Sequence, residues 1–83
     1  MFVTYILQSL KTNEFYTGST GDFDLRLTQH QQGLSRSTKH ACPWKVVYQE
    51  QFPTRAQAMQ RERYFKTGKG REELQRLLLS TRP

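Results

Sequence analysis

The eight residues Phe2–Ser9 constrain the fold more than any other part of the chain. Apolar, aromatic or β-branched side chains occupy most positions in both alternating sets, so a strand here has two largely apolar faces. A strand of this kind lies in the middle of a sheet and is covered on both sides. Because 83 residues leave room for only one small core, we expect residues 1–83 to form a single domain around this strand.

The segments that follow predict an α+β domain. A polar turn at 11–14 and a strand pattern over Phe15–Ser19 complete a β-hairpin. Asp22 can cap a helix that ends near Gly33, and a basic connection over 34–43 precedes a third strand. We expect that strand over Trp44–Gln51, a helix from the Thr54 and Gln57 capping box to Gly68, and a last helix over about Arg71–Leu79. The order ββαβαα predicts a three-stranded antiparallel sheet flanked by three helices.

Two tyrosines are predicted to share one face of the hairpin. If the hairpin loop has an even number of residues, the numbers of paired positions sum to an odd number, and Tyr5 and Tyr16 then point the same way. Core tyrosines are common in strands, so this face alone assigns no role. Gly18 is typical of a close approach by backbone or ligand, or of a bulge.

Glu62 is the anomalous residue of the helix over 55–67. Ala58, Met59 and Phe65 lie at i−4, i−3 and i+3 from it, which places Glu62 within the stripe that should face the core. A buried carboxylate is costly unless it is paired or binds a metal. Two interpretations stay open: a surface pair with Lys66, or a metal ligand at the floor of a basic site.

The first helix offers a second candidate pair. Arg26 and His30 are four residues apart and lie on the side that Phe23 and Leu27 mark as facing the core. A histidine in this position is more often a hydrogen-bonded core residue than a catalyst. The neighbouring arginine favours a pair that faces a phosphate group.

The charge balance points to a polyanionic partner. Thirteen Lys and Arg residues against seven Asp and Glu give a net charge of +6, which is typical of nucleic-acid binding, although a solvated basic surface is the alternative. The cations form two clusters that suit phosphate contacts or ordinary solvated loops: Arg36, Lys39 and His40, and Lys66, Lys69 and Arg71.

Several other classes of protein are disfavoured. No apolar run approaches the length of a membrane span, and the N-terminus lacks the pattern of a signal peptide. Cys42 is the only cysteine, so no internal disulfide or cysteine-based zinc site is expected. We therefore expect a cytoplasmic protein with no membrane partner.

An ordered set of motifs resembles the GIY-YIG nuclease superfamily, and most closely its small stand-alone bacterial group. The set comprises Val3-Thr4-Tyr5, Tyr16-Thr17-Gly18, Arg26, His30 and Glu62, together with the stretches 42–48 and 61–70. The similarity covers roughly residues 2–77. The chain departs from the family in lacking Gly and Ile in the first motif and Ile in the second. Its only asparagine is Asn13, whereas many members have one near the end of the domain.

This resemblance implies a divalent-metal-dependent endonuclease that hydrolyses phosphodiester bonds, and we expect DNA to be the substrate. A domain of 83 residues has no room for a separate recognition module, so we expect it to select structure rather than sequence. By analogy, Glu62 would hold one Mg²⁺ or Mn²⁺ ion, with no small-molecule cofactor, and Tyr5 would help deprotonate the attacking water. Tyr16 would orient that water or the phosphate, Arg26 would neutralise phosphoryl charge, and His30 would hydrogen-bond Tyr5 or the phosphate. Nucleic-acid contacts are expected from Gly18, Lys45 and the two basic clusters. The alternative is a catalytically weak nucleic-acid-binding module with the same fold.

Overall fold

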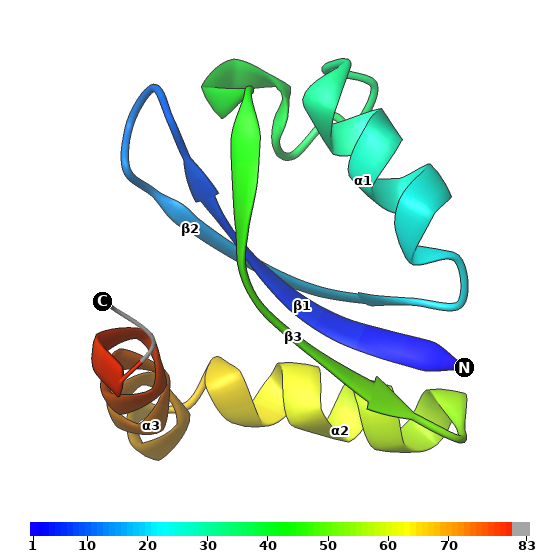
Figure 1. The fold of residues 1–83 in the computed structure, drawn as a ribbon, viewed down its shortest axis with the longest axis vertical. Coiled ribbons are helices and arrows are strands. Elements are labelled where there is room, and N and C mark those ends of the chain that lie inside the picture. The colour runs from blue at the N-terminus through cyan, green and yellow to red at the C-terminus, as the bar shows by residue number, and fades with distance from the viewer. Residues whose placement is uncertain (81–83) are drawn as a thin grey trace.

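The computed structural model describes residues 1–80 and confirms the predicted α+β architecture, with a three-stranded antiparallel sheet between two helical layers (Figure 1). The strand order is β2-β1-β3, so the hydrophobic N-terminal strand is central and the other two are edges. The strands are β1 (Phe2–Ser9), β2 (Phe15–Thr20) and β3 (Trp44–Phe52). The helices are α1 (Phe23–Gln31), the short 3₁₀ helix η1 (Lys39–Ala41), α2 (Arg55–Phe65) and α3 (Gly68–Ser80).

Each face of β1 packs against a different layer, as its two apolar faces predict. Val3, Tyr5 and Leu7 are buried on the face covered by α1, where they form a core cluster with Ala41 and Trp44. Ile6 is buried on the opposite face against α2 and α3, with Phe65 and Leu74 (Figure 1). The central strand therefore joins two separate core clusters.

The hairpin register confirms that the two tyrosines share a face. Tyr5 lies opposite Gly18 and Leu7 lies opposite Tyr16, so the paired numbers have an odd sum. The rings of Tyr5 and Tyr16 have centroids 6.2 Å apart. Gly18 is a regular ladder position rather than a bulge, and a Cβ atom there would lie 2.6 Å from the Tyr5 hydroxyl. The absence of a side chain at Gly18 thus lets Tyr5 extend across the edge strand.

The predicted helix caps of α1 and α2 are present. The Asp22 side chain accepts from the backbone N–H of Leu25 at 3.1 Å, and the Thr54 hydroxyl accepts from the N–H of Gln57 at 3.3 Å. Each cap satisfies a backbone donor that has no partner within its helix.

The boundary between the last two helices differs from the prediction. Helix α2 ends at Phe65, and α3 begins at Gly68 instead of Arg71. Thr67 initiates α3, because its hydroxyl accepts from Gly70 N–H at 3.1 Å and its carbonyl accepts from Arg71 N–H at 2.9 Å. A Cβ atom on Gly70 would lie 1.7 Å from the Tyr64 carbonyl oxygen. Gly70 is therefore a close-packing position inside α3, and the two glycines do not break the helix.

Within residues 1–80, the longest helices are too short and too polar to cross a bilayer.

Candidate active site

A chain of buried hydrogen bonds runs from β1 through α1 to the loop that follows it. The Tyr5 hydroxyl lies 2.9 Å from Nε2 of His30, and Nδ1 of His30 lies 2.7 Å from the Thr38 hydroxyl. The Thr38 carbonyl accepts from the Trp44 indole N–H at 3.1 Å. All four residues are buried. Both ring nitrogens of His30 thus have protein partners, which fixes the orientation of the imidazole.

Burial determines the protonation of this chain. It lowers the pKa of His30 to about 4, with the nearby Arg26 charge acting in the same direction, so the imidazole is neutral at pH 7. Burial raises the pKa of Tyr5 to about 12, so the phenol keeps its proton. A neutral imidazole has one donor and one acceptor nitrogen. If Nδ1 donates to Thr38, Nε2 is free to accept the phenolic proton of Tyr5.

Arg26 brings the positive charge to the two tyrosines. Burial alone would lower its pKa, but hydrogen bonding to the hydroxyls of Tyr5 and Tyr16 raises that pKa above its ordinary value. Its guanidinium also donates to the Gln29 side chain at 2.9 Å and to the Ser35 hydroxyl at 3.3 Å. These anchors hold a fixed cation beside both phenols.

Glu62 approaches β2 from the sheet face opposite the two tyrosines. Ser19, the neighbour of Gly18, points toward α2, and its hydroxyl donates to Oε1 of Glu62 at 2.6 Å. Lys66 donates to Oε2 at 2.8 Å. Partial burial would raise the pKa of the Glu62 carboxyl, but these two hydrogen bonds hold it below its ordinary value. The carboxylate is therefore ionised at the edge of β2, and its charge also raises the pKa of Tyr5.

The stripe on α2 is only partly as predicted. Ala58 and Phe65 are buried, but Met59 is 39% exposed, so the prediction of a core position for Met59 is wrong. The helix presents Ala58, Glu62 and Phe65 to the sheet, because these positions repeat at four and three residues. Met59 falls outside that stripe. The predicted Glu62–Lys66 pair is present, with the Lys66 side chain 54% exposed and that of Glu62 24% exposed.

The residues at this edge fit one hard cation. Mg²⁺ and Mn²⁺ prefer oxygen ligands, and Mg²⁺ in particular keeps several waters while using one or two carboxylates and substrate phosphates. Glu62 supplies an ionised, partly exposed carboxylate, and its Lys66 partner is solvent-accessible. Among the residues described, no group of three or more His, Cys, Asp or Glu could hold a metal ion by itself. An ion on Glu62 would therefore depend on water and substrate for its other ligands.

The two basic clusters occupy different places. Arg36 lies on the loop that carries Ser35 and Thr38, and Lys39 begins η1 directly after it; both are exposed next to the buried chain. His40 is exposed and lies 3.1 Å from Glu14 in the hairpin turn. Lys66, Lys69 and Arg71 are exposed around the junction of α2 and α3. Lys45 is exposed near the start of β3, the edge strand on the other side of β1 from β2.

Three polar residues of the site were missed by the sequence analysis. Ser19 could have been found, because the same register that joins Tyr5 to Tyr16 puts it on the face of Glu62. Ser35 and Thr38 carry no periodic signal, since they lie in an irregular loop whose position depends on tertiary packing.

Comparisons with known proteins give a consistent result. A family model described as the GIY-YIG catalytic domain matches residues 1–75. A UPF0213 protein of Staphylococcus haemolyticus is 37% identical over 65 residues, which are 77% of this chain and 79% of that protein. The UPF0213 protein YazA of Bacillus subtilis is 39% identical over 57 residues, or 68% of this chain and 58% of that protein.

The fold has a solved counterpart. The solution NMR structure of a UPF0213 protein from Bacillus halodurans superposes with a TM-score of 0.56 and 32% sequence identity. The match covers 93% of this chain and 85% of the other.

Proposed function

This chain belongs to the GIY-YIG catalytic domain family, a nuclease superfamily that acts on nucleic acids, and on that premise we propose that it is a metal-dependent endonuclease for DNA. The family membership confirms the resemblance seen in the sequence. One observation supports the proposal above the others. An ionised carboxylate, Glu62, and a cluster of two phenols with a guanidinium meet at the edge of β2, around Gly18.

Glu62 would hold one Mg²⁺ or Mn²⁺ ion by exchanging its Lys66 contact for the metal. When bound, such an ion supplies positive charge to the phosphate and lowers the pKa of a coordinated water. Ser19 keeps the carboxylate oriented through its hydrogen bond to Oε1. Lys66, once released, is free to contact a phosphate oxygen of the substrate.

The proton of the attacking water would pass to the Tyr5 oxygen. With a pKa of about 12, Tyr5 is a weak acid that can accept this proton only if its own proton leaves toward His30 Nε2, 2.9 Å away. The water oxygen would form the new bond to phosphorus as the bond to the leaving ester oxygen breaks. The proton taken up by His30 would then pass through solvent to the departing oxygen, because a group with a pKa of about 4 does not keep it. Thr38 supports the transfer by accepting from Nδ1 of the same imidazole.

Arg26 and Tyr16 would act on the phosphate. The Arg26 guanidinium has five N–H donors and is held beside both phenols, so it stabilises negative charge that develops on phosphoryl oxygens. Tyr16 would orient the water or the phosphate through its hydroxyl. Exposed cations of the two clusters would add sequence-independent contacts to the backbone, which favours selection of DNA structure over sequence.

A weakly catalytic nucleic-acid-binding module is the second candidate. Two observations favour it. The ion pair with Lys66 occupies the Glu62 carboxylate, and the high pKa of Tyr5 keeps its phenol protonated. A panel of nicked, branched, single-stranded and duplex DNA, incubated with Mg²⁺, Mn²⁺ or chelator, separates the two. We expect cleavage with either metal and none with chelator. Binding of the panel without cleavage under any metal condition would favour the module.

A further inference from the structure

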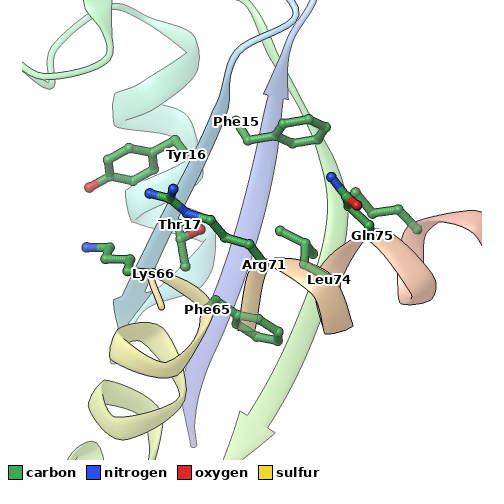
Figure 2. A pocket seen from close by; sticks show the side chains of 9 residues that line it. Phe15, Tyr16, Thr17, Phe65, Lys66, Arg71, Leu74 and Gln75 are labelled. Atoms are coloured by element: carbon green, nitrogen blue, oxygen red, sulfur yellow. The ribbon is translucent and has the colours of Figure 1, made fainter. Parts of the chain in front are cut away.

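A groove opens between the edge strand β2 and helix α3, next to the candidate active site (Figure 2). Its volume is about 630 Å³, which lies in the range of small-molecule sites. Its lining includes Phe15, Tyr16, Phe65, Lys66, Arg71 and Leu74. Aromatic and aliphatic side chains therefore meet cations in one concave surface.

The apolar part of the groove has an exposed aromatic wall. Phe65 and Leu74 are buried and belong to the core cluster behind the groove, whereas Phe15 is 51% exposed at its rim. Phe15 lies opposite Gln8 in the ladder, and with half of its surface exposed it contributes little to the core. Its accessible ring face is suited to stacking on a planar ligand.

The charged part of the groove faces the active site. Figure 2 shows the Arg71 side chain extending from α3 toward Tyr16 and Thr17 on β2. Among the residues described, no acidic side chain forms an ion pair with Arg71. Tyr16 and Lys66 border both the groove and the site, because Lys66 holds Glu62 and Tyr16 lies beside His30 with ring centroids 4.9 Å apart. A nucleotide in the groove would thus be next to the phosphate that a metal ion on Glu62 would bind.

We propose that this groove binds an unpaired nucleobase adjacent to the scissile phosphate, stacked on Phe15, with the flanking phosphate on Arg71 and Lys66. The inference rests on the proposed function and adds the substrate class: DNA with a single-stranded segment at the cleavage position. A base in a duplex is stacked on both faces and paired with the opposite strand, so it must be unstacked and unpaired before it can enter. An unpaired base enters without that cost and can stack on an aromatic side chain whatever its identity.

A second copy of the chain is a poorer occupant. Each copy carries a net charge of +6, and the groove itself presents Arg71 and Lys66, so association through this surface would bring like charges together. An anionic nucleotide has the complementary charge, and its base has the shape and polarity for the apolar wall.

The test measures binding separately from cleavage. Two proteins are compared: the Glu62→Gln variant, and the same variant with the additional change Phe15→Ala. The affinity of each is measured for a single-stranded oligonucleotide and for duplex DNA. We expect Phe15→Ala to weaken single-strand binding about 10-fold and duplex binding by less than twofold. Leu25→Ala is the matched control, because Leu25 is 56% exposed on α1 and does not line the groove. It should leave both affinities unchanged.

Abasic nucleotides locate the stacked base. Placed singly along the oligonucleotide, an abasic residue should reduce wild-type affinity at one position and cause no additional loss in Phe15→Ala. Phe15→Trp should restore affinity and give a fluorescence signal that bound bases quench, whereas the single native tryptophan, Trp44, is buried and serves as background.

Equal single-strand affinity of Phe15→Ala and its parent would overturn the inference about the groove. If the wild type still cleaved DNA, the proposed endonuclease function would hold without the base site. Phe15-dependent self-association in sedimentation would also overturn it and assign the groove to a second copy. Phe15-dependent, abasic-sensitive binding without any cleavage would support the base site while failing the proposed endonuclease.

Discussion

The two faces of β1 show how one strand can serve stability on one side and chemistry on the other. Toward α2 and α3 it presents Ile6, packed against Phe65 and Leu74 in an apolar cluster. Toward α1 it presents Tyr5, whose hydroxyl enters a buried chain with His30 and Thr38. Adjacent residues of a strand thus contribute to environments of opposite character.

The comparison shows where function is concentrated. A buried polar chain contributes little net stability, because each group must replace the hydrogen bonds it made with water, and an unpaired member is costly. An apolar cluster of the same size stabilises through burial alone. The α1 face of β1 therefore has the composition of a reactive site, and the part of the opposite face around Ile6 has that of a structural core. Glu62 reaches the site from the α2 side at the edge of β2, where the Ser19 hydroxyl donates to its carboxylate.

The largest expected effect is on the apolar face. Ile6 is fully buried, so Ile6→Ala should lower the free energy of unfolding by about 2–5 kcal/mol, through lost burial and a residual cavity. Urea denaturation measures this change. Single-turnover cleavage by the folded fraction should stay near the wild-type rate. A large loss of rate per folded molecule would show that the Ile6 cluster takes part in the chemistry as well as in stability.

The hydrogen-bonded face should make stability depend on pH. His30 has a folded-state pKa of about 4 against 6.5 in the unfolded chain, so between these values the unfolded state binds more protons. Stability from this residue is complete above pH 6.5 and falls as the pH drops to 4, by about 3 kcal/mol in all. Urea denaturation from pH 4 to 8 tests this.

Two histidine variants provide the control. His30→Gln should remove most of that slope, and His40→Gln should retain it, because His40 is exposed. The same slope in His30→Gln would mean that other groups produce it.

Tyr5→Phe should lower the single-turnover cleavage rate by ~10²-fold, the scale for loss of a general base. The ring still packs against β2 and α1, so DNA affinity should change little. Arg26→Ala should reduce both rate and affinity, since its guanidinium also contacts the ground-state phosphate. Tyr16→Phe should have the mildest effect on rate. Near-wild-type cleavage by Tyr5→Phe, with normal circular dichroism, would return Tyr5 to a purely structural role.

The smallest effects are expected from exposed cations. Lys39→Ala and Lys69→Ala should each flatten the slope of log K against log[salt] by about one unit, because each removes one phosphate contact. Lys45→Ala is the matched variant on the opposite sheet edge and should leave the slope unchanged. An equal change for Lys45→Ala would extend the DNA-binding surface to β3.

Much of the fold follows from local signals. The alternation in Phe2–Ser9 predicts a doubly covered central strand, and the Asp22 and Thr54 caps predict where α1 and α2 begin. The register of the hairpin places Tyr5 and Tyr16 on one face, and this is predictable from the sequence because side chains in a strand alternate with a period of two.

The features that the sequence analysis did not predict depend on tertiary structure. Strand order is not encoded in the pattern of one strand, so the sequence could not place Lys45 on the edge strand opposite β2. The glycines before Arg71 predicted a helix boundary, but Gly70 is needed for contact with the Tyr64 carbonyl. Thr38 reaches His30 only because the irregular loop folds back over α1.

The central claim is that the two faces jointly form a metal-dependent nuclease site through Glu62. The most direct test is single-turnover cleavage by Glu62→Gln beside the wild type, in the same Mg²⁺ concentration, on whichever DNA substrate the panel selects. Gln keeps the shape and the Ser19 contact but removes the charge that attracts a cation. We predict no cleavage above the chelator background, with an unchanged fold by circular dichroism and stability equal to or slightly below the wild type, because the ionised Glu62 is favoured in the folded state. Cleavage by Glu62→Gln at the wild-type rate would contradict the account.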